Sequence, residues 1–300
     1  MNIIKHIAVM LLALLVVAVL AGCGGGGTGA SYDALGLIVF ESGSRDSKDI
    51  HLMRGNGLAQ RLVVANGEQP CLSPASNKIA FVRGNDIFTI NTDGTGLTNL
   101  TSHEDADLVV PEGILGCDIE TPAFSPTGDK IAYTSTPVVP EPTGTICIMN
   151  TDGTGRTTVV TNADHPAFSP DGNKIVFVRD EDIFTINTDG TGLIRLTDHG
   201  GVLLSLISYP VFSPAGDKIA YASTPVGGPV PVGTVIIHLI NADGTGGDTV
   251  VTDGDHPTFS PDGSRIVFVR DGSIFSTDQS GTDVIQLTDG PDDGYPNWAQ

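Results

Sequence analysis

The chain has 300 residues, of which 15 are basic and 35 acidic, so its net charge at pH 7 is −20. A nucleic-acid-binding protein needs a basic surface that displaces counterions from phosphates, and this composition is the reverse. No nucleic acid is therefore expected among its partners. An acidic surface instead favours solubility and repels anionic lipid headgroups.

The N-terminus carries a strong local signal. Lys5 precedes an apolar run from Ile7 to Ala21, which ends in Leu20-Ala21-Gly22-Cys23. A basic head, an apolar core of about 7–15 residues and small residues at a cleavage site are typical of a secretory signal peptide. The ending resembles the bacterial lipobox, so we expect residues 1–22 to be a lipoprotein signal peptide and Cys23 to be lipidated. An ordinary signal peptide or anchor that happens to end in Cys is the alternative.

Residues 23–36 are rich in glycine and predict a flexible tether. In lipoproteins of Gram-negative bacteria, an Asp directly after the lipidated Cys tends to retain the protein at the inner membrane. Gly24 stands at that position here. We therefore expect a location in the cell envelope, with the lipid on Cys23 in the outer membrane and the protein facing the periplasm if the envelope is Gram-negative.

The rest of the chain is repetitive. The segment 166–179, Pro-Ala-Phe-Ser-Pro-Asp-Gly-Asn-Lys-Ile-Val-Phe-Val-Arg, recurs at 257–270 with few changes, and weaker copies begin at Pro70, Pro122 and Pro210. A repeat of about 40–50 residues is typical of a propeller or an array. Helical periodicity is absent throughout.

Each repeat predicts four short strands, illustrated by Ala167–Ser169, Lys174–Val178, Ile183–Ile186 and Leu193–Thr197. Pro-Asp-Gly makes a tight turn after the first strand, and Asp189-Gly190 is a hairpin signal after the third. The second strand is apolar on both faces. A four-stranded sheet of this kind buries both faces only when it packs between neighbours, as in a β-propeller.

The two ends of the repetitive region complete one another. Segments 37–41 and 49–53 look like second and third strands without a first, whereas Pro296-Asn297-Trp298-Ala299 looks like a first strand alone. We therefore predict an all-β, six-bladed propeller of four-stranded antiparallel blades over 37–300, closed by one blade that the two termini share. Closure removes exposed sheet edges. An open solenoid leaves the two partial units unexplained.

The repeat Phe-Ser-Pro-Asp-Gly-x-Lys-Ile-Val-Phe, followed by Asn-Thr-Asp-Gly-Thr-Gly, resembles the propeller repeat of TolB, the periplasmic component of the Tol–Pal envelope system. The resemblance covers roughly residues 37–300. It implies the propeller fold and an envelope location, but similar repeats serve many functions. TolB also has an α/β domain before its propeller and a mature form without lipid. The present sequence indicates neither of these two features.

Strand order predicts that the Pro-Asp-Gly turns and the Asp-Gly hairpins share one face of the disc. The opposite face then carries the links between blades and those between second and third strands, and loops of irregular length alternate around it. One such link, 198–209, contains Leu203, Leu204, Leu206 and Ile207. These residues are candidates for a binding patch on that face, or for a lid that folds over the disc.

His165 and His256 each precede a first-strand proline, and Asp164 and Asp255 precede the histidines. Equivalent positions of a propeller lie near the mouth of its central channel, so both histidines are candidate binding residues. Imidazole and carboxylate also suit zinc. Such repeated residues more often only cap the start of a strand, and acid pairs elsewhere match no calcium loop. We therefore predict no metal or other cofactor.

Three cysteines remain besides Cys23, and they cannot all pair internally. We expect buried thiols, with a Cys71–Cys117 disulfide as the alternative.

No motif of a serine hydrolase, a zinc protease or a phosphate-binding loop occurs in the chain. We therefore predict a non-enzymatic, lipid-anchored scaffold that binds another envelope protein. The alternatives are an enzyme (a hydrolase or lyase) acting on a sugar or lactone at the channel mouth, and a structural spacer without a partner.

Overall fold

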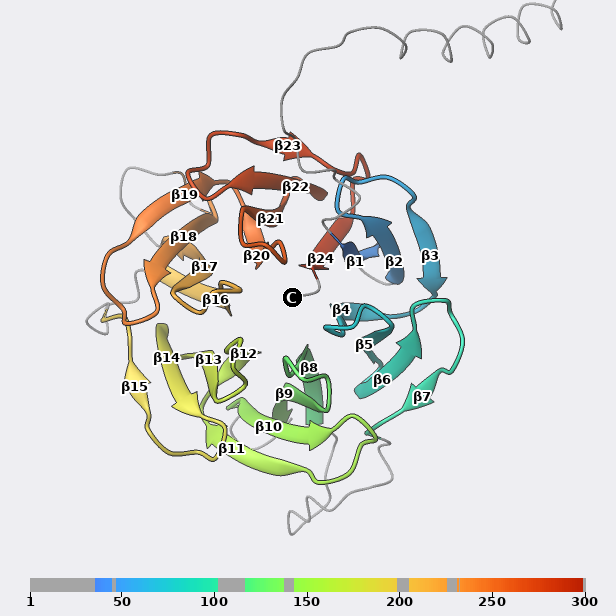
Figure 1. Ribbon diagram of the computed structural model, residues 1–300, viewed down its shortest axis with the longest axis horizontal. Coiled ribbons are helices and arrows are strands. Elements are labelled where there is room, and N and C mark those ends of the chain that lie inside the picture. Colours follow the sequence, from blue (N-terminus) through green and yellow to red (C-terminus); the bar gives the residue numbers. More distant parts are fainter. Residues whose placement is uncertain are drawn as a thin grey trace, which may run out of the picture. The chain divides into compact units, whose positions relative to one another are not determined.

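The computed structural model describes residues 36–44, 47–101, 117–137, 143–198, 205–225, 231 and 233–298, all within the unit Asp33–Gln300. These residues form six four-stranded antiparallel sheets, which stand around a common centre as the blades of a propeller (Figure 1). The predicted architecture is confirmed. The signal peptide, Cys23 and the tether up to residue 35 lie outside the described residues.

The innermost strands surround the centre of the ring: β24 (Asp293–Trp298), β4 (Glu68–Leu72), β8 (Cys117–Phe124), β12 (Asp164–Phe168), β16 (Ser205–Phe212) and β20 (Asp255–Phe259). The second strands are β1 (Leu37–Ser42), β5 (Lys78–Arg83), β9 (Lys130–Pro137), β13 (Lys174–Arg179), β17 (Lys218–Pro225) and β21 (Arg265–Arg270). The third strands are β2 (Asp49–Arg54), β6 (Asp86–Asn91), β10 (Thr145–Asn150), β14 (Asp182–Asn187), β18 (Ile236–Asn241) and β22 (Ser273–Asp278). The outermost strands are β3 (Arg61–Val64), β7 (Thr98–Asn99), β11 (Thr157–Thr161), β15 (Ile194–Arg195), β19 (Asp248–Thr252) and β23 (Ile285–Gln286).

The ring closes through β24, which is the innermost strand of the blade that β1 to β3 complete. β24 pairs antiparallel with β1, and Trp298 lies opposite Ile38. The predicted sharing of one blade by the two termini is therefore confirmed.

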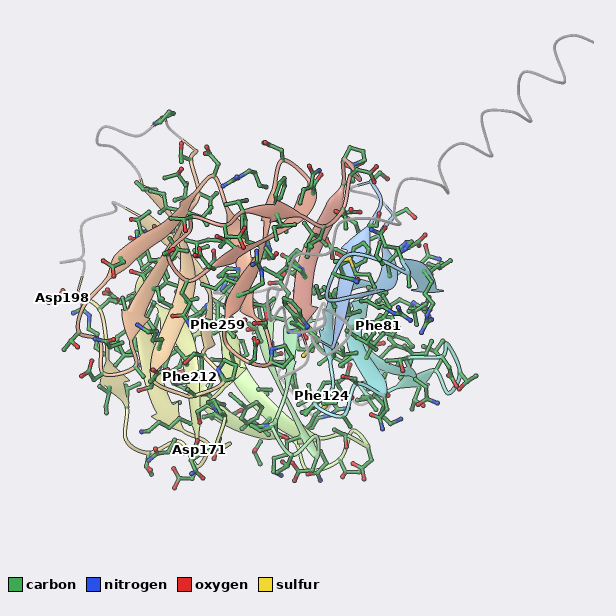
Figure 2. All side chains as sticks on the ribbon, turned by 45° about the horizontal axis from the view of Figure 1, so that its top comes forward. Phe81, Phe124, Asp171, Asp198, Phe212 and Phe259 are labelled. Carbon is green, nitrogen blue, oxygen red and sulfur yellow. The ribbon has the colours of Figure 1, made fainter. Side chains whose placement is uncertain are left out.

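Apolar clusters between adjacent blades form the core. In one of them Ile146 and Ile148 of β10 meet Phe168, Ile175 and Phe177 of the next blade. Six such clusters occur within the described residues. Phe212 and Phe259 accordingly lie inside the body, whereas Asp171 and Asp198 lie at its edge (Figure 2). Each sheet thus buries both faces, as its doubly apolar second strand predicts.

Side-chain hydrogen bonds fix the turns. Asp189 Oδ1 accepts the Thr191 N–H at 2.9 Å, and Gly190 has φ of +83°, a conformation that glycine adopts without a Cβ clash. The Thr188 N–H donates to Asn173 O at 3.0 Å. This bond ties the hairpin to the Pro-Asp-Gly turn, so both lie on one face of the blade, as predicted.

Several strand boundaries differ from the prediction. The innermost strand β12 begins at Asp164 rather than Ala167, and the outermost strand β15 contains only Ile194–Arg195. β16 begins at Ser205, so the second half of the predicted 198–209 loop is strand. Strands β8, β9, β16 and β17 extend to eight residues because they continue pairing beyond the disc on the face of the inter-blade links.

The Cys71 thiol is buried and is not in a disulfide. Burial raises the pKa of this thiol to about 11, so it packs as a small apolar group rather than as a nucleophile. Cys147 is only partly buried, which corrects the expectation of a buried thiol there. The side chain of Cys117 lies outside the described residues.

Alternate blades share an arginine at the end of the second strand: Arg83, Arg179 and Arg270. Arg179 donates from Nη2 to Thr161 O at 2.7 Å and from Nε to Asn162 O at 3.1 Å. Its guanidinium carbon lies 5.4 Å from the centre of the Phe177 ring. Each arginine thus holds the link that leads into its own blade and covers the aromatic pair beneath it.

Replacing Arg179 with Ala is expected to lower the free energy of unfolding by about 1–2 kcal/mol, because both carbonyl bonds and the cation–π contact are lost. Arg179→Lys keeps the charge but not the planar set of guanidinium donors, so the free energy of unfolding should fall by less than in the alanine variant. Urea denaturation followed by circular dichroism measures both variants. An alanine variant as stable as the parent chain would show that the link is held without this side chain.

Candidate functional site

A recurrent backbone irregularity shapes the centre of the propeller. In every innermost strand the residue before the proline has a positive φ, from 44° at Tyr295 to 56° at His165. The six residues are Gln69, Thr121, His165, Tyr209, His256 and Tyr295. The ladder shifts register at each of them, which is a β-bulge that re-aims a side chain.

This conformation has a cost. A left-handed residue other than glycine is disfavoured by roughly 1–2 kcal/mol, and the following proline restricts it further. Such strain persists where the surrounding structure imposes it, and it is often found at functional sites. Six equivalent bulges therefore mark the centre as a place where side-chain direction matters.

The bulges surround a cavity of about 130 Å³. Each blade contributes three consecutive residues to its wall: the left-handed residue, the proline and the residue after it. In β12 and β20 the left-handed residue is the second residue of the strand, near the inter-blade links, whereas in β8 and β16 it lies in the middle of the strand.

Four aromatic side chains from four blades meet in this cavity. The Tyr209 ring stacks on His256 with centroids 3.9 Å apart, and His165 meets Tyr209 edge-on at 4.4 Å. Tyr295 lies against His256 at 4.0 Å. The hydroxyls of Tyr209 and Tyr295 share a hydrogen bond of 2.8 Å. We call these four residues the aromatic cluster.

The two histidines of the cluster carry buried nitrogens without a hydrogen-bond partner among the described residues: Nδ1 of His165, and Nδ1 and Nε2 of His256. His256 Nδ1 lies 3.2 Å from Asp255 Oδ2, within ion-pair distance but without the geometry of a hydrogen bond. Burial, reinforced by the charge of His256, lowers the pKa of His165 to about 4, against an opposing effect of Asp255. The His165 imidazole is therefore neutral at pH 7.

Burial also shifts the pKa values of the two tyrosines. It raises the pKa of Tyr295 to about 12, the charges of Glu41, Glu120 and Asp255 raise it as well, and the hydrogen bond with Tyr209 lowers it. Burial also raises the pKa of Tyr209, and the neighbouring Tyr295 raises it further. Both hydroxyls thus stay protonated near neutral pH.

The comparisons with known proteins agree with the propeller fold. The family model for the TolB beta propeller domain matches residues 117–300, more than half of the chain. The chain belongs to this TolB-like propeller family. A second model, for the dipeptidyl peptidase IV N-terminal region, matches residues 48–137.

Solved structures share the fold at low sequence identity. TolB from Acinetobacter baumannii matches with a TM-score of 0.71 and 19% identity, over 89% of this chain and 67% of that one. A putative TolB from Agrobacterium tumefaciens matches at 0.62 and 18%, over 84% and 88%. Oligogalacturonate lyase in complex with manganese matches at 0.58 and 15%, over 85% and 74%. No curated protein matches the chain.

The structure brings two of the predicted site residues of this TolB-like propeller together: His165 and His256 both line the cavity. Sequence reasoning missed Tyr209 and Tyr295, although Ser208-Tyr209-Pro210 and Gly294-Tyr295-Pro296 occupy the same place in the repeat as Asp164-His165-Pro166. Aligning the residues before the six first-strand prolines is the signal that finds them.

Only part of the predicted apolar patch is exposed. Leu206 is 62% exposed on β16, whereas Ile207 is buried between blades beside Phe212 and Tyr221. Ile207 therefore belongs to the core, because the strand alternation of β16 turns it away from Leu206. Leu203 and Leu204 lie outside the described residues.

No group of three or more His, Cys, Asp and Glu side chains suited to a metal ion occurs in the described part of the chain.

Proposed function

We propose that this protein is a non-enzymatic, lipid-anchored scaffold of the cell envelope, which binds another envelope protein at the mouth of its propeller channel. The observation that carries the proposal is the cavity ringed by six strained bulges, whose aromatic cluster contains buried nitrogens without partners. A concave, mostly apolar site with a few convergent polar groups is the usual form of a binding site. Membership in the TolB-like family supports the envelope location.

The anchor is proposed from the sequence. The Leu20-Ala21-Gly22-Cys23 motif supports lipid attachment at Cys23, and Gly24 favours the outer membrane, facing the periplasm, in a Gram-negative envelope. In the described part of the chain no helix is long and apolar enough to cross a membrane.

The two tyrosines of the cavity do not support base catalysis, whereas the neutral His165 imidazole is able to accept a proton. The pKa values of Tyr209 and Tyr295 are raised, so neither hydroxyl is prepared to act as a base near pH 7. Hydrolysis or lyase chemistry on a sugar or lactone remains the alternative function, and the match to oligogalacturonate lyase shows the shared fold only.

A photo-crosslinking experiment in cells of the source organism tests the proposal. A photoreactive residue in place of Leu206, which is exposed on the mouth face, should form a covalent adduct with one envelope protein. The matched position Asp171, in a turn on the opposite face, should not. Cys23→Ser should move the protein out of the membrane fraction and abolish the adduct. Equal labelling from both faces, or none from either, would contradict the scaffold function.

A further inference from the structure

We propose that the channel mouth binds an organic cation presented by the partner, an arginine or lysine side chain, between the aromatic cluster and the carboxylates that precede the bulges. This inference rests on the proposed function and names the chemistry that the site accepts.

The first observation is the position of the acids. In four of the six blades the residue directly before the left-handed residue is acidic: Glu68, Glu120, Asp164 and Asp255. We call these four residues the acidic ring. The same repeat position places them next to the cavity wall in their blades. Each of these acids thus lies one residue before the cavity wall, and the charges of Glu120 and Asp255 act on the Tyr209 and Tyr295 hydroxyls inside it.

The second observation is that the acidic ring lacks basic partners. Within the described residues Glu68, Glu120 and Asp164 form no ion pair, and Asp255 contacts only its own neighbour His256. Glu41, which is not part of the ring, shows the contrast: it pairs with Lys48 at 3.3 Å and accepts the Gln69 N–H at 2.9 Å. Partial burial raises the pKa of Glu120, and the charges of Asp118, Asp164 and Glu68 raise it further. A bound cation would relieve this repulsion.

The third observation comes from the aromatic cluster. A tyrosine ring attracts a cation to its face, and the negative charges of Asp255 and Glu120 act on both tyrosine hydroxyls. A neutral imidazole has one nitrogen that accepts a hydrogen bond, and the buried His165 Nδ1 and His256 Nε2 have no donor. A guanidinium offers five N–H donors and an ammonium three, so either supplies both the charge and the missing donors.

Size and valence favour an organic cation over a bare metal ion. The cavity of about 130 Å³ is larger than a single ion requires, and the described residues contain no cluster of three metal-ligating side chains. The net charge of −20 also draws cations toward the protein from a distance.

Isothermal calorimetry on the full-length lipoprotein in detergent tests the inference. The probe is a blocked tripeptide, acetyl-Gly-Arg-Gly-amide, and the matched control replaces arginine with citrulline, which keeps the shape but carries no charge. We expect the arginine peptide to bind at least ten-fold more tightly. The double variant Glu120→Gln/Asp164→Asn should weaken that binding at least ten-fold without lowering the melting temperature. Asp171→Asn/Asp248→Asn, which neutralises two exposed acids on the opposite face, should leave it unchanged.

Equal affinity for both peptides, or equal affinity of both double variants for the arginine peptide, would overturn the inference. A second titration uses calcium chloride alone. Binding of Ca²⁺ but not of the arginine peptide would show that the acidic ring binds an inorganic cation, and this result would also overturn the inference. If the peptide fails while the mouth still crosslinks to an envelope protein, the scaffold function stands and only its cationic ligand is wrong.

Discussion

Trp298→Ala is expected to lower the free energy of unfolding by about 3–5 kcal/mol, the range found for truncating a large buried aromatic side chain. Trp298 is 1% exposed and packs with Ile38, Phe40 and Met53. It lies on β24, the strand that closes the ring against β1. The variant therefore removes core contacts at the one junction where distant parts of the chain complete a blade.

Guanidinium or urea denaturation followed by circular dichroism measures this effect. Tryptophan fluorescence serves only the parent chain, because Trp298 is its single tryptophan. Leu193→Ala, at a side chain that is 47% exposed, is the matched control and should change stability by no more than about 0.5 kcal/mol. A loss for Trp298→Ala as small as that of the control would show that the closing strand is dispensable for stability.

Acidification from pH 6.5 to about 4 is expected to destabilise the parent chain through His165. The pKa of this buried imidazole is lowered from 6.5 to about 4 in the folded protein. Between these values the unfolded chain binds a proton that the folded chain does not, so stability falls as the pH falls, by about 3 kcal/mol in total. Below pH 4 both states are protonated and this contribution is fully lost.

His165→Gln isolates that contribution. Gln69 occupies the equivalent left-handed position of another blade, so glutamine is compatible with the backbone there. Burial raises the pKa of Asp164, and burial together with neighbouring acids raises the pKa of Glu120. These two groups therefore stabilise the folded protein as the pH falls, which is opposite to the effect of His165. Both groups remain in the variant, so their contribution cancels in the comparison. The difference in unfolding free energy between parent and variant should therefore change across pH 4–6.5. A constant difference over that window would contradict a buried neutral His165.

Much of the fold could be predicted because its determinants are local. The Pro-Asp-Gly and Asp-Gly turns, the doubly apolar Lys174–Arg179 segment and the two partial units at the ends all lie within short windows of the sequence. The turns depend on the backbone conformation of a few residues, and the strands on the pattern of apolar residues within one short segment. Strand ends were less predictable, since the bulge at His165 lets β12 begin before its proline.

The candidate site could be predicted only in part, for a physical reason. The repeat places a residue before each first-strand proline, which was enough to select His165 and His256 but not to show that they meet. That Tyr209 stacks on His256, and that Tyr295 hydrogen-bonds to Tyr209, depends on the number of blades, on ring closure through β24 and on the left-handed bulges that turn these side chains inward. The blades and the turns follow from short-range interactions, and the two partial units at the ends were enough to predict the shared closing strand. Which side chains face one another across the channel follows from the folded ring alone, because that contact joins residues from four blades at once.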